Sequence, residues 1–148
     1  MMENAASRPS LADLVLLAGR LLLTLIFLHE GFTLVADIAA TLAIFEKLGL
    51  PALVTFCVIA LQIGAGLAIA VGFLSRIGAV ALGLFCLATA FLFHTDLSNQ
   101  NELLHFEKDL AIAGGMFVLA VAGAGSISLG GLVKRQVKGL HPWLMAVL

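Results

Sequence analysis

One apolar stretch, residues 19–31 with the sequence G-R-L-L-L-T-L-I-F-L-H-E-G, constrains the fold more than any other part of the chain. It is apolar enough to enter a lipid bilayer, yet it holds Arg20, His29 and Glu30 within one helical segment. An unpartnered charge in hydrocarbon costs about 3 kcal/mol on insertion scales, so charged residues of membrane helices normally face protein or water. Other helices must therefore shelter these side chains.

The composition identifies lipid as the main solvent of the chain. Of the 148 residues, 61% are hydrophobic and only 11% are charged, whereas a soluble domain has about 25% charged residues to keep its surface wetted. The formal net charge is -1 and the lysines and arginines are scattered, so no basic surface is expected to bind nucleic acid. We expect one membrane domain with the lipid bilayer as its first partner.

Four apolar segments are long enough to cross a bilayer, which takes about 20 residues of helix. They cover about residues 11–36, 52–72, 77–93 and 103–122. Residues 37–48 are too few to span and are followed by Gly49-Leu50-Pro51, a helix-stop signal. The sequence therefore predicts an all-α fold, an integral membrane four-helix bundle with a short interfacial helix between the first and second spans. Residues 1–10 are expected to form a polar tail, and residues 126–148 an interfacial one.

The positive charges are divided unequally between the two sides that four spans would create. The side with the termini carries Arg8, Arg76, Lys134, Arg135 and Lys138, and the other side carries Lys47 with Lys108 close to it. Because cytoplasmic loops are enriched in Lys and Arg, both termini are expected in the cytoplasm.

With this orientation, polar residues from distant parts of the chain gather near the extracytoplasmic ends of their helices. At 1.5 Å per residue, Glu30 lies roughly 9 to 11 Å deep, Lys108 and Asp109 roughly 6 to 8 Å, and His94 at the rim. His105 shares a helix face with Lys108 and Asp109. The candidate outer polar pocket therefore comprises Glu30, His94, His105, Lys108 and Asp109.

Glu30 and Lys108 are expected to pair, because opposite charges at similar depth offset each other's cost of leaving water. That pair is compatible with a functional pocket and with a purely structural role. The histidines show no fixed-spacing ligand motif such as H-x-x-x-H, so no metal site is predicted and interfacial or hydrogen-bonded histidines are the alternative to metal or haem ligands.

A second polar pair is predicted deeper in the bilayer. Arg20 and Gln62 both lie near the midplane when each is counted from its own helix end. The guanidinium has five donors that Gln62 and backbone carbonyls can accept, so a structural anchor between the first two spans is expected. Cys57 and Cys86 form no C-x-x-C motif, and the sequence leaves open whether they pair.

The order of landmarks resembles the DoxX family of small bacterial inner membrane proteins over about residues 15–132. Residues 19–31 carry part of the likeness, and the other matching stretches are F-E-K-L-G-L-P (45–51), G-A-G-L-A-I-A-V-G-F-L-S-R (64–76), T-A-F-L-F-H (89–94) and F-E-K-D-L-A-I-A-G-G (106–115). The resemblance implies a four-helix membrane bundle associated with quinone- or thiol-linked redox systems. Gln62 stands where many relatives have Glu, and a Lys common in relatives is missing near Thr33.

Three functional hypotheses follow. In the first, the chain is a redox-associated subunit whose outer pocket takes a quinone and which works with a redox enzyme partner. The second is a non-catalytic anchor or assembly protein that holds a partner enzyme or a copy of itself in a homo-oligomer. The third is a small-molecule transporter that works as an oligomer, since four helices without an internal repeat lack the two halves of most transporters. No catalytic residue is assigned, and whether the chain is an enzyme stays open.

Overall fold

The computed structural model describes residues 9–136 and residue 141, and these residues form six α-helices with no strand. The helices are α1 (Leu11–Ala36), α2 (Ile38–Lys47), α3 (Ala52–Val71), α4 (Ser75–Phe93), α5 (Gln100–Ala122) and α6 (Leu129–Gln136). The prediction of an all-α fold is confirmed. Most of the two predicted tails, including Arg8 and Lys138, lies outside the described residues.

The limits of α1 are set by capping residues. Ser10 Oγ accepts a hydrogen bond from Asp13 N at 3.2 Å, and Asp13 Oδ2 accepts one from Ser10 N at 3.0 Å, the reciprocal pattern that satisfies free amides at a helix start. At the other end, Asp37 follows α1 and its side chain accepts from Ala40 N at 3.0 Å. Asp37 thereby caps α2, and the chain changes direction between the two helices.

Within the described residues, α1, α3 and α4 have the length and composition to cross a membrane, with mean hydropathies of 2.2, 2.3 and 2.0. Helix α5 has 23 residues, but its first half carries four charged residues, Glu102, Glu107, Lys108 and Asp109. Its second half, residues 110–122, has no charged residue. The charge in α5 is thus confined to one end of the bundle.

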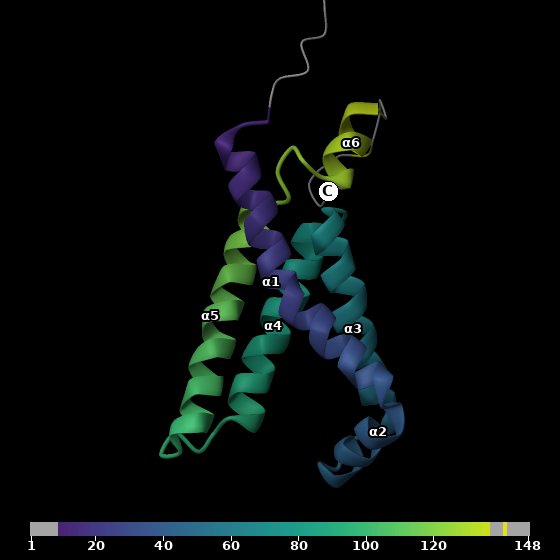
Figure 1. Ribbon diagram of the computed structural model, residues 1–148, viewed down its shortest axis with the longest axis vertical. Coiled ribbons are helices and arrows are strands. Elements are labelled where there is room, and N and C mark those ends of the chain that lie inside the picture. The colour runs from purple at the N-terminus through teal and green to yellow at the C-terminus, as the bar shows by residue number, and fades with distance from the viewer. Residues whose placement is uncertain (1–8, 137–140, 142–148) are drawn as a thin grey trace, which may run out of the picture.

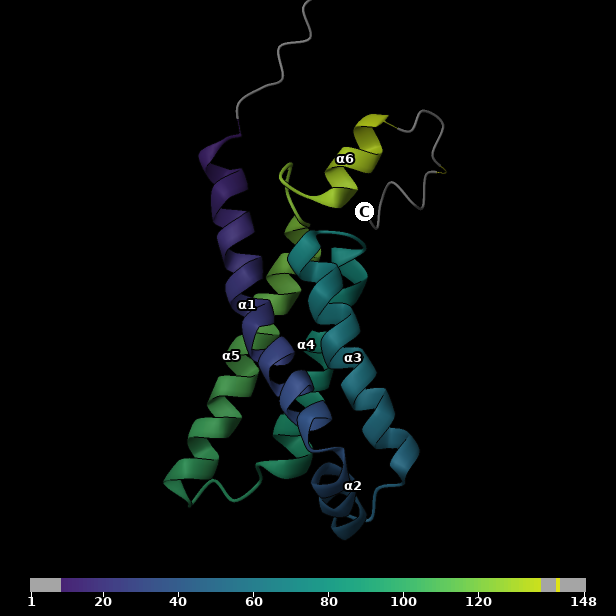
Figure 2. The ribbon, with the colours of Figure 1, turned by 45° about the vertical axis from the view of Figure 1, so that its right-hand side comes forward.

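The long helices form two pairs, α1 with α3 and α4 with α5, joined mainly between α3 and α4 (Figures 1 and 2). At one end lie α2 and the loop between α4 and α5, which we call the α2 end. At the other, the α6 end, lie the start of α1, the turn between α3 and α4, and α6. In both views the two pairs diverge toward the α2 end.

The core between the pairs is small and apolar. Ile69, Leu82 and Met116 are completely buried, and Phe27 is nearly so. Glycines allow close approach: a Cβ atom on Gly83 would lie 2.8 Å from Phe117 Cε1. The outer faces carry large exposed apolar side chains such as Leu22 and Val121, as expected where the surrounding solvent is lipid.

Candidate functional site

A cavity of about 210 Å³ lies between α1, α3, α4 and α5 toward the α2 end. Helices α1, α4 and α5 each place side chains there that share one face, at spacings of three or four residues, and α3 contributes one side chain. The lining consists of Ile26, Phe27, Glu30, Gln62, Phe85, Cys86, Thr89, His94, Lys108, Asp109 and Ile112. We call it the polar cavity, because all four helices contribute at least one polar group to it.

Asp109 is the best-fixed polar group of the polar cavity. Thr89 Oγ1 on α4 lies 2.9 Å from Asp109 Oδ2 on α5 and donates a hydrogen bond to it. The same hydroxyl lies 2.9 Å from the carbonyl oxygen of Cys86 and 3.2 Å from that of Phe85, so three acceptors share its one proton. The Asp109 side chain is only 15% exposed, and this contact holds its carboxylate at the cavity wall.

His94 connects this carboxylate to the helix start of α5. Its Nδ1 lies 2.8 Å from Glu102 Oε2, and its Nε2 lies 4.0 Å from Asp109 Oδ2. The ring also stacks on His105, with centroids 5.2 Å apart. A line of titratable groups therefore runs from Glu102, at the loop side, to Asp109 in the polar cavity, with a hydrogen bond at its outer end and a separation of 4.0 Å at its inner end.

His105 contacts the polar cavity indirectly. Lys108 Nζ lies 3.0 Å from His105 Nδ1, and because an ammonium group can only donate, the imidazole nitrogen is the acceptor of this hydrogen bond. His105 is absent from the lining residues. It positions its two neighbours, His94 through ring stacking and Lys108 through this bond.

Glu30 and Lys108 both line the polar cavity, but the prediction that they form an ion pair is wrong. No ion pair joins them in the part of the chain that the structure describes; its only ion pairs are those of His94. The helix pairs diverge at this end, so the two side chains face a shared space. Both remain exposed, with charges available to a ligand.

The prediction that Arg20 pairs with Gln62 is also wrong. Arg20 Nη1 donates to Ala124 O and Nη2 to Ile127 O, each at 2.6 Å. A Cβ on Gly72, at the end of α3, would lie 2.8 Å from Arg20 Nη1, and Gly72 is ten residues, or about 15 Å of helix, beyond Gln62. Counting depth from each helix's own end fails because α1 extends past the end of α3.

Gln62 instead lines the polar cavity, where its Oε1 is buried without a hydrogen-bond partner. An unsatisfied buried amide oxygen costs about 1 to 3 kcal/mol, so this atom is suited to a ligand that donates a hydrogen bond. Sequence reasoning placed Gln62 elsewhere and missed Thr89 and Cys86 as lining residues. The signal for Thr89 was present, since it is the only hydroxyl residue in the apolar segment 77–93.

An apolar groove of about 410 Å³ adjoins the polar cavity. The two share Glu30, Gln62, Phe85 and Thr89. The other residues of the groove are Leu34, Phe45, Leu48, Leu50, Val54, Val58, Ala88, Leu92 and Phe93. Because α2 supplies Phe45, this short helix closes one side of the groove. The polar cavity and the apolar groove therefore lie side by side, with the four shared residues between or beside them.

The loop that carries His94 has its own local bonds. Asp96 Oδ1 accepts hydrogen bonds from Ser98 Oγ and from Ser98 N. The side-chain bond from Ser98, chiefly, holds the pKa of Asp96 below its usual value. Asp96 therefore stays charged in the turn that leads from α4 to α5.

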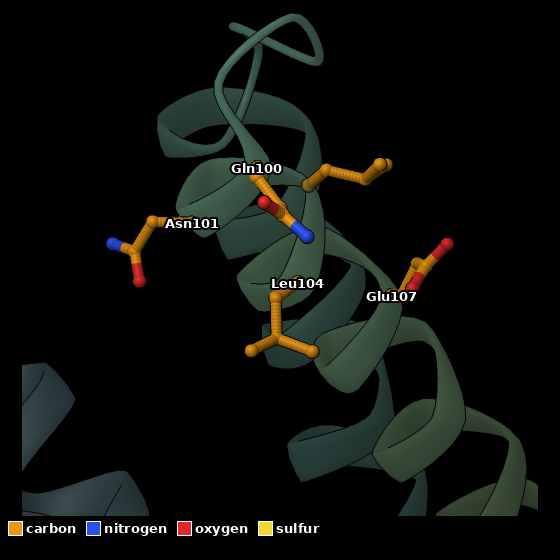
Figure 3. Close-up of a pocket in the computed structure, with 5 residues that line it drawn as sticks. Gln100, Asn101, Leu104 and Glu107 are labelled. Atoms are coloured by element: carbon orange, nitrogen blue, oxygen red, sulfur yellow. The ribbon is translucent and has the colours of Figure 1, made fainter.

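A further concavity, about 530 Å³, lies elsewhere, on the first turns of α5. Figure 3 shows that Gln100, Asn101, Leu104 and Glu107 project there in different directions. Ligand sites bring a few polar groups together over apolar walls, and this surface does not. We therefore assign the site to the polar cavity and its groove.

The cysteines and metal-ligating residues add no further site. Cys57 is exposed, Cys86 is buried, and both are free thiols, so they form no disulfide with each other. Across residues 9–136 and 141, no three His, Cys, Asp or Glu side chains are grouped so as to hold a metal ion. His29 is exposed on α1 and does not line the polar cavity.

Comparisons with known proteins show that this chain is similar to membrane proteins. The DoxX family matches residues 15–95. The inner membrane protein YqjF of Escherichia coli strain K12 is 36% identical over 126 residues, covering 85% of this chain and 97% of YqjF. The inner membrane protein YphA of the same strain is 31% identical over 134 residues, covering 86% and 93%. No solved structure matches the chain.

Proposed function

We propose, from the premise that this chain belongs to the DoxX family, that it is a subunit of a membrane redox system whose polar cavity holds a quinone head group. The three apolar helices and the inner membrane relatives support a multi-pass inner membrane protein. The redox role and the quinone are the steps that we propose beyond this.

The proposed topology has four spans, α1, α3, α4 and α5, within a membrane domain of residues 11–125. Helix α2 lies at the interface. The charged half of α5 is at the α2 end, where head groups and water can solvate it. The α6 end carries Arg76, Lys134 and Arg135. The α2 end carries Lys47, with Lys108 close to it. The excess of positive charge favours cytoplasmic termini, with the polar cavity near the extracytoplasmic side.

The observation that carries the proposal is that the polar cavity and the apolar groove adjoin and share Glu30, Gln62, Phe85 and Thr89. A quinone has a ring with two oxygens and an apolar tail, and so it needs polar groups beside apolar walls. The Gln62 amide has a donor and an acceptor, so it can donate to a quinone carbonyl or accept from a quinol hydroxyl. Both oxidation states would find a partner there.

Proton transfer is the chemistry that this chain's residues can perform. A quinone supplies two-electron, two-proton redox chemistry when bound. Asp109 is held at the cavity wall by Thr89, and His94 lies between Asp109 and Glu102. These groups can pass protons between the loop at the α2 end and a ligand oxygen. Electrons would be exchanged with the redox enzyme partner.

The test is to purify the full chain in mild detergent, extract the lipids and measure quinone per chain. We expect stoichiometric quinone in the wild type and in Glu107→Gln, a control on α5 outside the polar cavity. Glu30→Gln should retain much less, because it removes a charged group at the junction of cavity and groove. The absence of quinone from the wild type would overturn the proposal.

One observation favours the second candidate, an anchor that assembles with a copy of itself. Cys57, Ala60 and Gly64 are exposed along one side of α3, and a Cβ on Gly64 would meet nothing within 4 Å. Small residues four apart allow membrane helices to pack closely. Oxidative crosslinking through Cys57 in native membranes tests this candidate: a crosslinked dimer that persists in Glu30→Gln supports an anchor, and a monomer excludes packing through this face.

A further inference from the structure

We propose that the α6 end carries a separate binding site for the phosphate group of an anionic phospholipid. A cavity of about 340 Å³ lies there between α4, the end of α5 and α6. Its lining residues are Arg76, Ala122, Gly123, Ala124, Gly125, Ser126, Gly131, Lys134 and Arg135. We call it the basic cavity, because three cationic side chains and no carboxylate line it. The proposal is independent of the quinone site.

The basic side of α6 faces this cavity because of how the helix is anchored. Ser128 Oγ accepts from Gly131 N at 3.0 Å and so caps the start of α6. Gly130 N donates to Gly72 O at 3.0 Å, which fixes α6 on the turn between α3 and α4. At about 100° per residue, Gly131, Lys134 and Arg135 then share one face. These are the residues of α6 that line the basic cavity.

Arg76 forms the fixed part of the site. Its Nη1 donates to Ala120 O at 2.8 Å and to Val121 O at 2.5 Å, and its Nη2 donates to Ala122 O at 3.5 Å. These bonds satisfy carbonyl oxygens at the end of α5 and hold the guanidinium in place. Among the residues that the structure describes, no carboxylate pairs with Arg76, and backbone carbonyls are neutral, so its charge is uncompensated there.

Lys134 and Arg135 are the adjustable part. Neither makes a hydrogen bond or an ion pair with any residue that the structure describes, and both are exposed. The acid nearest to the loop is Asp13, and its carboxylate already accepts from Ser126 N at 2.7 Å and from Ser10. Three positive charges around one cavity therefore call for an external anion. Phosphate oxygens are the acceptors that arginine and lysine bind most strongly.

The surroundings favour a lipid as the source of that phosphate. The basic cavity adjoins the first turn of α4 and the last of α5, where exposed Ile77 and Val121 extend the apolar outer surface. On the opposite face of α6, Leu129 and Leu132 are about half exposed, as in helices that lie in the interface. Basic cavities at the ends of membrane helices are suited to anionic head groups.

The experiment uses the full chain in nanodiscs of phosphatidylethanolamine mixed with phosphatidylglycerol, followed by transfer to mild detergent and quantification of retained lipid. We expect phosphatidylglycerol to be enriched on the wild type. Lys134→Gln should reduce the enrichment about fivefold, and Lys134→Gln with Arg135→Gln about 25-fold. Lys47→Gln, the same replacement at the α2 end, is the matched control and should have no effect. Lys134→Arg should retain the enrichment.

Competition with inorganic phosphate distinguishes a site for a lipid head group from a site for a soluble phosphate ion. If excess inorganic phosphate leaves the phosphatidylglycerol bound, the lipid assignment is supported. If phosphate binds the wild type but neither lipid is enriched, the site takes a soluble anion and the lipid assignment is overturned. Equal retention of the two lipids, or an equal loss in Lys47→Gln, overturns it as well. Because Lys134 and Arg135 make no bonds within the described fold, the variants are expected to unfold at the wild-type temperature.

Discussion

The two ends of the bundle use charged residues in different ways. At the α6 end, Arg20, Arg76 and Asp13 each bond to the backbone of residues 120–127 at 2.5 to 3.5 Å. At the α2 end, Glu30 and Lys108 line a cavity without pairing with each other, and Gln62 Oε1 has no partner. The charges that bond to the backbone hold the fold together, whereas charges that line a cavity without such bonds, Glu30 here and Lys134 and Arg135 in the basic cavity, are available to a ligand.

The backbone at each end explains the difference. The segment from Gly123 to Ser128 leaves α5 without continuing as a helix, so its carbonyls and amides need partners, and Arg20 and Asp13 of α1 supply several of them. Arg76 of α4 bonds to the last carbonyls of α5 itself. At the α2 end, α1, α2 and α4 are followed by helix caps or short turns whose backbone bonds are largely local. Few backbone groups there compete for the charged side chains.

The largest effect is expected at the α6 end, for Arg20→Met. This change removes two charge-assisted hydrogen bonds to Ala124 O and Ile127 O and leaves both oxygens without that partner. We expect the free energy of unfolding to fall by about 3 kcal/mol, measured by reversible unfolding in mixed micelles. Lys47→Met, at an exposed position of α2, is the control. A loss of less than about 1 kcal/mol would mean that Arg20 is no anchor.

A second test at the α6 end is Gly72→Ala. Gly72 has φ +73°, and an added Cβ would lie 2.4 Å from Ser128 Cβ and 2.8 Å from Arg20 Nη1. Because both the backbone conformation and the space disfavour a side chain, we expect a loss of about 2 kcal/mol in the same unfolding measurement. Gly19→Ala adds a Cβ that meets nothing within 4 Å and should not destabilise. Equal effects of the two variants would contradict the close packing at this end.

At the α2 end, Glu30→Gln is expected to change stability by less than about 0.5 kcal/mol, since exposed groups without partners contribute little. The same variant should lose bound quinone. A large loss of stability would show that Glu30 is a structural residue with a partner, and the contrast between the two ends would not hold.

The smallest effect is expected in the loop between α4 and α5. The pKa of Asp96 is lowered by its bond from Ser98, so its contribution to stability is present above its unfolded pKa and is lost as the pH falls through the lower, folded value. Asp96→Asn should therefore reduce the acid sensitivity of hydrogen exchange at residues 96–99. An unchanged pH profile would show that the turn does not depend on the charge.

Family, helical class and membrane environment were predictable, because composition and helix-scale runs of apolar residues depend only on local sequence. Ser10 is also the N-cap that the sequence indicated. The gathering of Glu30, His94, Lys108 and Asp109 in one layer was expected from depth alone, and these residues do line one cavity. Whether they are a functional site remains part of the proposal.

What the sequence could not supply was the position of one helix relative to another. The Arg20 error arose because α1 extends beyond α3 at the α6 end, an offset that no local pattern encodes. The Glu30–Lys108 error arose because the divergence of the helix pairs depends on packing along their whole length. For the same reason the sequence did not reveal that Gln62 and Thr89 join the polar cavity, or that three cations converge on the loop after α5.

The most direct test of the contrast measures stability and bound quinone on the same preparations of Arg20→Met and Glu30→Gln. The account predicts that Arg20→Met lowers the free energy of unfolding and that the chains still folded keep their quinone. It predicts that Glu30→Gln keeps wild-type stability and loses the quinone. If Glu30→Gln were as unstable as Arg20→Met and still bound quinone, the assignment of Arg20 to the structure and of Glu30 to a quinone site would be contradicted.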